Sequence, residues 1–380
     1  MAFERRAVID ILAAAALVMK GQPRVAGLAG AMLAAGKLPA SLLFTGPEGA
    51  GKELAAMWTA ARLNCEAPGT CGASATPDSR GAAVCQACDK IGRLEHPDIH
   101  IVYPLPSGPM EKTVPEIIES RRADFMASGE FEGKARSIGI DQVREMIREA
   151  SKQPFEGKRS VAMLPEAHLA TVEAQNAFLK LLEEPPPSTV LILATDHPDR
   201  LLPTIRSRCH EIRFDALPDE ATGEFLSLFY SVEEREAARL AAIAQGNIRR
   251  GIRLLDPRYL GIRADAASML KLVLAGKAAR LPAEAEAAAR EYTREETARL
   301  MEEMVFLMRA AMLDREGRLG PQRRSELGKE LGAEALAAAA ERDLPRDIRK
   351  IEASSRNLSR NVDLELTLVQ LLLDLAGKWY

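Results

Sequence analysis

This sequence of 380 residues has few aromatic side chains, a small net charge and no long hydrophobic run. Aromatic residues make up 4% of the chain and the formal net charge is −3, which argues against a strongly basic nucleic-acid-binding protein. The apolar stretch at residues 11–19 is too short to cross a bilayer, and charges of both signs precede it. We therefore predict a helix here rather than a signal peptide, and a cytoplasmic protein without a membrane partner.

Cysteine is also scarce, but four of the five cysteines lie close together. These four residues are Cys65, Cys71, Cys85 and Cys88, and their spacing is C-x5-C-x13-C-x2-C. Without a predicted export signal, clustered thiols favour a metal site over disulfides. Four thiolates form a closed, structural zinc site, which predicts a zinc module over about residues 65–95. The alternative is a set of four reduced surface cysteines.

Short apolar runs alternate with helical patterns through the first half of the chain. The runs span residues 42–45, 100–103, 160–164, 189–195 and 211–214. Between them, residues 139–152 and 171–184 place apolar side chains three and four positions apart. This alternation predicts an α/β domain with a parallel sheet over residues 1–216. Residues 105–136 interrupt it with proline, glycine and mixed charge, which predicts an insertion or mobile loop containing a short helix.

The patterns typical of strands end after Pro218. Residues 217–258 predict a small helical domain, and residues 259–380 predict long amphipathic helices rich in Ala, Leu, Glu and Arg. The chain therefore has three predicted domains, two of them entirely helical.

Residues 42–55, LLFTGPEGAGKELA, lead from an apolar run through a glycine-rich turn into a helical pattern. Gly46, Gly51 and Lys52 meet the P-loop spacing G-x-x-x-x-G-K, with Gly49 between them. Such a loop binds phosphates through backbone N–H groups, a helix N-terminus and the lysine. The alternative is an ordinary glycine-rich turn between a strand and a helix.

Both protein ligands that a P-loop site offers to magnesium are missing. Glu53 stands where a Ser or Thr hydroxyl is expected, and Pro165 follows the second apolar strand where an Asp is expected. We therefore expect no ATP hydrolysis by this chain, although Lys52 can still hold a phosphate weakly. Glu166 is interpreted as a solvated carboxylate at a strand end.

Six segments occur in one order: GPEGAGKE, the four-cysteine loop, HPDIHIVYP, IDQVREM, VAMLPEAHLATVEAQNAFLKLLEEPP and LATDHPDRLLPTIRSRC. Together they resemble the AAA+ clamp-loader subunits of bacterial DNA polymerase III, over roughly residues 40–256. The altered nucleotide motifs and the short helical tail resemble the delta-prime type rather than the gamma/tau motor.

The resemblance implies an architecture and partners. It implies zinc on the four cysteines, a lid domain at 217–258 and an oligomerisation collar at 259–380. It also implies a hetero-pentamer with gamma/tau and delta subunits, which loads a sliding clamp onto primer–template DNA.

The resemblance further implies roles for single residues. In Ser207-Arg208-Cys209, Arg208 is the arginine finger that reaches the γ-phosphate of ATP on a neighbouring subunit. Thr195 and Arg249 occupy the places of the first and second nucleotide sensors. The alternatives are that Thr195 is an ordinary polar residue at a strand end, and that both residues are relics of an altered nucleotide site. From the residues alone, Arg208 is one surface arginine among many. Cys209 is interpreted as a small buried residue, and His96 as part of a turn rather than a zinc ligand.

Two other functions are compatible with parts of the sequence. An active gamma/tau-type ATPase would share the motifs, but Glu53 and Pro165 argue against it. A zinc-dependent DNA-binding module is disfavoured by the net charge of −3, the few aromatic residues and the closed four-cysteine pattern.

Overall fold

The structure is a computed structural model, and it describes residues 10–68, 70–71, 84–106, 110–126, 136–358 and 362–377. The chain forms two compact units, Met1–Ile252 and Arg253–Tyr380, each with its own core. The first unit includes residues 217–252, so the predicted division of the chain into a lid and a collar stays a prediction. Within the described residues, no helix is long and apolar enough to cross a membrane.

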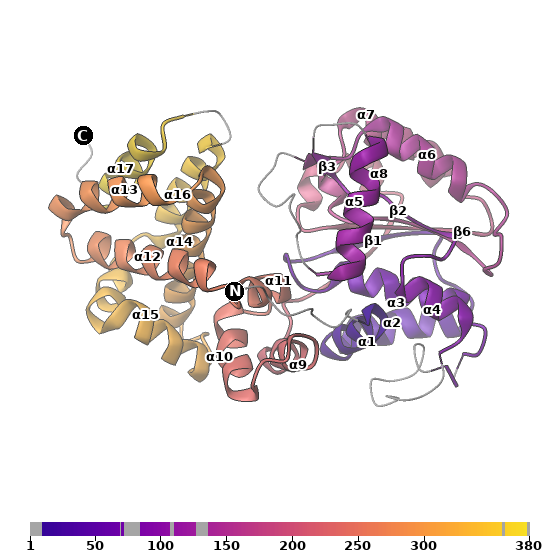
Figure 1. The fold of residues 1–380 in the computed structure, drawn as a ribbon, viewed down its shortest axis with the longest axis horizontal. Helices are drawn as coiled ribbons and strands as arrows, with labels where there is room; N and C mark the ends of the chain where they lie inside the picture. The colour runs from indigo at the N-terminus through magenta and orange to yellow at the C-terminus, as the bar shows by residue number, and fades with distance from the viewer. Residues whose placement is uncertain are drawn as a thin grey trace. The chain divides into compact units, whose positions relative to one another are not determined.

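The first unit is built on a five-stranded sheet in which every strand pair is parallel (Figure 1). In spatial order the strands are β2 (Ile99–Ile101), β5 (Ser160–Leu164), β6 (Thr189–Thr195), β1 (Ser41–Thr45) and β7 (His210–Arg213). The observed strands overlap the five predicted apolar runs. The predicted α/β class with a parallel sheet is therefore confirmed.

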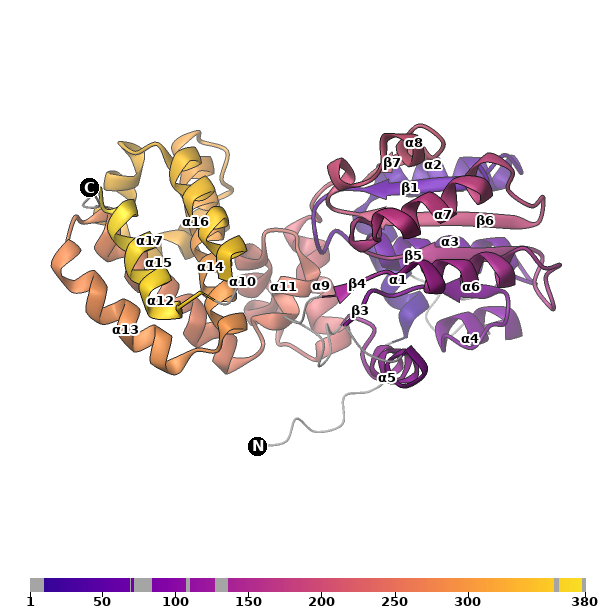
Figure 2. The ribbon, with the colours of Figure 1, turned by 90° about the horizontal axis from the view of Figure 1, so that it is seen from above.

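Both faces of this sheet are covered by helices, as parallel sheets require (Figure 2). Successive side chains of a strand point to opposite faces. Leu42 and Phe44 of β1 therefore join the core formed with α1 (Ile11–Gly21) and α3 (Lys52–Asn64). Leu43 joins the opposite core, which includes side chains of α6 (Ile140–Ala150) and α7 (Val172–Glu183).

Local signals explain where several helices begin. Asp10 caps α1, because its carboxylate accepts hydrogen bonds from the backbone N–H groups of Leu12 and Ala13. Thr171 caps α7 in the same way. The remaining helices of this unit are α2 (Pro23–Ala34), α4 (Gln86–Gly92), α5 (Met110–Ala123), α8 (Pro203–Arg206), α9 (Asp219–Tyr230), α10 (Glu234–Ala244) and α11 (Ile248–Arg253).

The predicted insertion at 105–136 is partly ordered. It contains α5, which is longer than expected, and strand β3 (Leu105–Pro106), which pairs antiparallel with β4 (Arg136–Ser137). The sequence did not predict this pairing, because two-residue strands carry no periodic pattern. Residues 107–109 and 127–135 of the insertion lie outside the described residues.

The second unit is helical throughout its described part, as predicted for residues 259–380. Its helices are α12 (Pro257–Leu274), α13 (Leu281–Glu291), α14 (Arg294–Arg315), α15 (Pro321–Ala340), α16 (Leu344–Leu358) and α17 (Leu364–Leu375). A single apolar core joins them. Inside it, Arg263 pairs with the fully buried Glu303 and with Glu330, and Tyr259 donates a hydrogen bond to Glu303.

Candidate functional site

The glycine-rich turn connects the carboxyl end of β1 to the N-terminus of α3. Gly49 and Gly51 both have left-handed backbone angles, with φ of 69° and 85°. Any side chain would also collide, because a Cβ on Gly49 would lie 1.9 Å from Asn247 Oδ1 and one on Gly51 would lie 2.2 Å from a Val18 methyl group. The fold around the loop therefore requires both glycines, with or without a phosphate.

Lys52 turns back onto its own loop. Its Nζ donates hydrogen bonds to the carbonyl oxygens of Gly46 at 2.8 Å and Pro47 at 2.6 Å. Burial lowers the pKa of Lys52 to about 8, against the opposing effect of the Asp196 carboxylate. The ammonium thus has partners within the protein.

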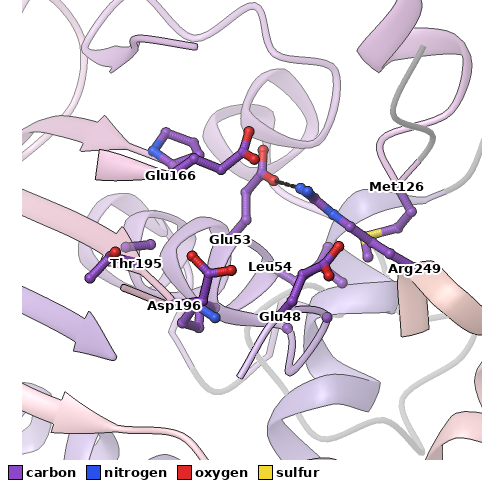
Figure 3. A pocket seen from close by; sticks show the side chains of 13 residues that line it. Glu48, Glu53, Leu54, Met126, Glu166, Thr195, Asp196 and Arg249 are labelled. Carbon is purple, nitrogen blue, oxygen red and sulfur yellow. Dashed lines mark hydrogen bonds and ion pairs between the residues drawn. The ribbon is translucent and has the colours of Figure 1, made fainter. Parts of the chain in front are cut away.

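Glu53, at the position expected for a magnesium-binding hydroxyl, is the centre of a buried ion-pair cluster (Figure 3). Its Oε2 accepts a hydrogen bond at 3.0 Å from Arg249 of α11 and lies 3.5 Å from Nη1 of Arg121 of α5. The three side chains are between 8% and 14% exposed. The predicted second sensor therefore contacts the residue that replaces the metal ligand.

The end of β5 also differs from a metal-binding strand. Pro165 offers no carboxylate, and Glu166 forms a two-fold ion pair with Arg136, with N–O distances of 3.0 and 3.1 Å. Burial would raise the pKa of Glu166, but Arg249 and Arg136 hold it below its ordinary value. Glu166 is thus a largely buried, paired carboxylate, which corrects the expectation of a solvated one.

Thr195, at the end of β6, is buried and its hydroxyl is occupied by local contacts. It accepts a hydrogen bond from the backbone N–H of His197 at 3.0 Å and lies 3.1 Å from Nδ1 of His168. Asp196 also lies 3.1 Å from Nδ1 of His168. The predicted first sensor therefore belongs to a polar cluster at the carboxyl ends of β5 and β6.

These residues surround a small cavity of about 60 Å³. Its lining comes from the glycine-rich loop, the start of α3, the ends of β5 and β6, and α11 (Figure 3). The predicted site residues Gly49, Gly51, Lys52, Thr195 and Arg249 therefore do come together, around one small cavity.

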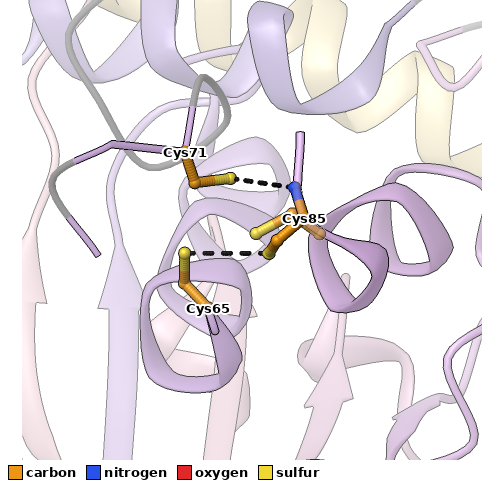
Figure 4. Close-up of side chains that lie close together, drawn as sticks. Cys65, Cys71 and Cys85 are labelled. Carbon is orange, nitrogen blue, oxygen red and sulfur yellow. Dashed lines mark hydrogen bonds between the residues drawn. The ribbon is translucent and has the colours of Figure 1, made fainter. Parts of the chain in front are cut away.

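The four clustered cysteines meet between α3 and α4 (Figure 4). Their sulfur atoms all lie within 4.8 Å of one another, and the Sγ atoms of Cys65 and Cys85 are 3.9 Å apart. Tetrahedral zinc with Zn–S bonds of about 2.3 Å places its sulfurs roughly 3.8 Å apart. The backbone N–H of Cys85 also donates to Cys71 Sγ at 3.4 Å. The cluster can therefore hold a metal ion such as zinc.

The Cys88 thiol is buried beside the other three cysteines of this cluster. Burial, together with the neighbouring thiols, raises the pKa of Cys88 far above its ordinary value. Four thiolates can share this space only around a cation. His96 is not part of the cluster: its Nδ1 accepts a hydrogen bond from the backbone N–H of Asp98, as the predicted turn implies.

Arg208 lies just after α8, on the surface of the first unit. Its side chain is 37% exposed and pairs with Glu183 at 2.8 Å, and its Nη1 donates to the carbonyl oxygen of Thr204. Neither contact is buried, so the guanidinium can exchange these partners for others. Cys209 beside it is half-buried, and burial raises the pKa of its thiol to about 12, which fits the packing role expected for it.

Several residues of the site were not predicted from the sequence. Arg121 and Arg136 come from the insertion, where no motif marks them. His168, Asp196 and His197 were also missed, although a signal existed. They follow two neighbouring parallel strands, whose carboxyl ends meet at one edge of the sheet.

A parallel sheet with a strand–glycine turn–helix at its carboxyl edge is the architecture of the P-loop nucleotide-binding class. Residues 21–218 match the family described as "DNA polymerase III, delta subunit". The chain therefore belongs to this family, the clamp-loader subunits of the AAA+ class, as its motifs predicted.

Named relatives are of two types. The chain is 32% identical to DNA polymerase III subunit gamma/tau of Mycobacterium tuberculosis over 198 residues, which are 52% of this chain and 28% of the relative. It is 34% identical to subunit delta-prime of Pseudomonas aeruginosa over 44% of this chain and 40% of the relative. Subunit delta-prime of Bacillus subtilis is 28% identical over 61% of this chain and 59% of the relative. The matched residues thus cover 28% to 59% of the length of these relatives, less than two thirds in each case.

Among solved structures, a gamma-subunit-related protein of Thermotoga maritima aligns over 92% of this chain and 99% of its own, with 15% identity and a TM-score of 0.37. The clamp loader delta protein of Bacillus subtilis aligns over 92% of this chain and 98% of its own, with 12% identity and a TM-score of 0.31.

Proposed function

We propose that this chain is a delta-prime-type subunit of the clamp loader: it hydrolyses no ATP itself and supplies Arg208 to the ATP site of a neighbouring subunit. Its partners are then gamma/tau and delta subunits in a hetero-pentamer, which loads the sliding clamp onto primed DNA. Zinc on the four cysteines is structural in this proposal.

The observation that carries the proposal is the ion-pair cluster of Glu53. A carboxylate bound to Arg249 and Arg121 stands where the hydroxyl ligand of magnesium is needed. Magnesium and a triphosphate would have to break this cluster, and the Glu53 carboxylate would then repel the phosphates. Pro165 supplies no second ligand. Both effects disfavour bound Mg-ATP at this loop.

The state of Lys52 supports the same conclusion. Its ammonium is held by two carbonyl oxygens of the loop, so binding a phosphate requires that these hydrogen bonds be exchanged. The glycines of the loop do not by themselves argue for nucleotide binding. A side chain at Gly49 would collide with Asn247 and one at Gly51 with Val18, so the fold needs these glycines even without a ligand.

The first test measures nucleotide binding and hydrolysis by the purified chain. We expect no ATP turnover and no magnesium-dependent binding of a fluorescent ATP analogue. The double variant Glu53→Thr/Pro165→Asp restores both magnesium contacts and is expected to bind the analogue more tightly than the wild type. ATP turnover by the wild-type chain at rates typical of a motor would instead favour a gamma/tau-type ATPase, the type of several relatives.

The second test addresses Arg208 in the reconstituted complex with clamp and primed DNA. An arginine finger stabilises charge on the transferred phosphoryl group and contributes a factor of about 10³–10⁵ at its site. Arg208→Ala should therefore lower total ATPase partially and clamp loading further, while folding, zinc content and assembly stay unchanged. Arg208→Lys should rescue poorly, because an ammonium lacks the planar fork of a guanidinium.

Two matched controls accompany this variant. Arg206→Ala removes an exposed arginine two residues away and should leave both activities intact. Lys52→Ala should barely affect loading, because the loop of this chain is not used for ATP. If the Arg208→Ala complex shows the same ATPase and clamp-loading activities as the wild type, Arg208 is an ordinary surface arginine and not an arginine finger.

A further inference from the structure

His168, Asp196 and His197 form a second group of metal-ligating side chains, separate from the four cysteines. His168 belongs to a short 3-10 helix, Ala167–Leu169, just after β5. Asp196 and His197 directly follow β6, the parallel neighbour of β5. Sheet pairing therefore brings these three side chains to one edge of the first unit, and the function proposed above does not use them.

The distances within this group fit one small cation. One ligand atom from each residue lies within 4.8 Å of the others. Asp196 Oδ1 is 3.1 Å from His168 Nδ1, and Asp196 Oδ2 is 4.0 Å from His197 Nε2. A tetrahedral zinc ion with bonds of about 2.0–2.2 Å to nitrogen and oxygen separates its ligands by roughly 3.4 Å. The two observed N–O distances, which involve the two different oxygens of Asp196, lie on both sides of this value.

The surrounding contacts orient the two histidines, and His168 Nδ1 would exchange its contact with the Thr195 hydroxyl for the ion. The two imidazole rings are 5.0 Å apart and meet edge to face, at 74°. The Thr195 hydroxyl lies 3.1 Å from His168 Nδ1 and accepts the backbone N–H of His197. The side chain of His168 is only 8% exposed, whereas that of His197 is 46% exposed. The group is thus anchored on its inner side and open to solvent on its outer side.

We propose that His168, Asp196 and His197 bind a divalent transition-metal ion, zinc above all, at the carboxyl ends of β5 and β6. Two imidazole nitrogens and one carboxylate suit zinc better than magnesium or calcium, which prefer oxygen ligands alone. With three protein ligands, the fourth position of the ion faces solvent. The ion joins two strand ends that line the cavity beside Lys52, since Asp196 is part of that lining.

The metal content of the purified full chain tests this proposal. After equilibrium dialysis against micromolar zinc we expect two zinc ions per chain, one on the cysteines and one on this group. Cobalt added to the chain whose cysteine site already holds zinc should give visible d–d bands without thiolate charge-transfer absorption. When the free zinc concentration is 100 times the Kd of the second site, binding of the second ion should raise the Tm of the chain by ~5 °C.

Variants then assign the second ion. His197→Gln changes an exposed side chain, so the fold is retained, and it should weaken the second equivalent by about tenfold or more while keeping the cysteine-bound zinc. Asp196→Asn should behave alike. His210→Gln, which removes another exposed histidine, is the control and should bind both ions as the wild type does.

Two results would overturn the proposal. One is a wild-type chain that holds a single zinc ion and gives no cobalt spectrum once its cysteine site is filled. The other is a second ion that His197→Gln and Asp196→Asn bind as tightly as the wild type. Either result leaves the proposals for Arg208 and Glu53 untouched, because neither depends on this ion.

Discussion

At the scale of single residues, Glu53 decides how the glycine-rich loop is interpreted. A carboxylate in the first turn of a helix is favourable in itself, because it faces the positive end of the helix dipole. Here it also neutralises Arg249 and Arg121, which come from α11 and α5. Glu53 therefore joins three elements of the first unit, α3, α5 and α11.

The cluster predicts a stability effect for Glu53→Ala. Removing the carboxylate takes away the ion-pair partner that two largely buried guanidinium groups share, with Glu166 as a remaining carboxylate nearby, and we expect this to cost about 3 kcal/mol of unfolding free energy. Chemical denaturation of the purified chain measures it. The control is Glu236→Ala, which breaks an exposed ion pair within one helix and should change little. Equal stabilities of the two variants would contradict the structural role given to Glu53.

Asp98 predicts a dependence of stability on pH. Its carboxylate accepts backbone N–H groups of Phe155, Glu156 and Gly157 at 2.6, 3.0 and 2.7 Å. Burial would raise the pKa of Asp98, but these donors and His96 hold it below the ordinary 3.8. A carboxyl group with a lowered folded-state pKa stabilises the fold fully above its ordinary pKa. That contribution is lost as the pH falls through the folded-state value.

Asp98→Asn should therefore destabilise the chain by about 2 kcal/mol at pH 7 and by less near pH 3. Denaturation curves of both proteins at several pH values measure the difference. A difference that does not change with pH would mean that the charge of Asp98 is not what holds the turn at residues 155–157.

At the scale of elements, the four cysteines connect the end of α3 to the start of α4. Cys65 follows the last residue of α3, and Cys85 and Cys88 lie at the start of α4. The four-cysteine cluster also belongs to the apolar core beneath the sheet, where Cys88 is fully buried. A metal ion here would fix a short helix that spans only seven residues.

Removal of the metal should therefore loosen α4 while leaving the sheet intact. Treatment with a strong chelator is expected to speed amide hydrogen exchange in α4, with little change in α7, which packs on the other face of the sheet. Mass spectrometry of exchanged peptides measures both regions. Identical exchange in α4 before and after chelation would argue against a structural metal.

At the scale of the whole molecule, the chain has separate cores. The largest apolar clusters of the first unit lie on the two faces of the sheet, and the apolar residues of α12 to α17 form a separate cluster. A unit with its own core can fold alone. This independence suits the role proposed above, in which the second unit joins the complex and the first unit supplies Arg208.

A chain truncated at residue 256 should thus fold, with a cooperative thermal transition, but fail to join the complex, since we propose that residues 259–380 form the oligomerisation collar. Circular dichroism measures the folding, and size-exclusion chromatography with the partner subunits measures the assembly. Full-affinity assembly of the folded, truncated chain would contradict the collar role.

Local sequence was enough to predict the strands, the main helices and the glycine-rich turn. Their signals lie in consecutive residues: apolar runs in β1, β5 and β6, helical spacing in α6 and α7, and glycines before Lys52. The paired strands β3 and β4 were missed, because a two-residue strand carries no period. The spacing of the cysteines likewise predicted the cluster of thiols in which they meet.

Tertiary structure alone decided which distant side chains meet. Glu53 and Arg249 are 196 positions apart, and no pattern in the sequence pairs them. His168 reaches Asp196 only because β5 and β6 are parallel neighbours that end at the same edge. Periodicity reports which face of an element is buried, but not what that face meets. The sequence by itself therefore determined the family and the position of the glycine-rich turn, whereas only packing of the sheet and helices decided which side chains surround that turn.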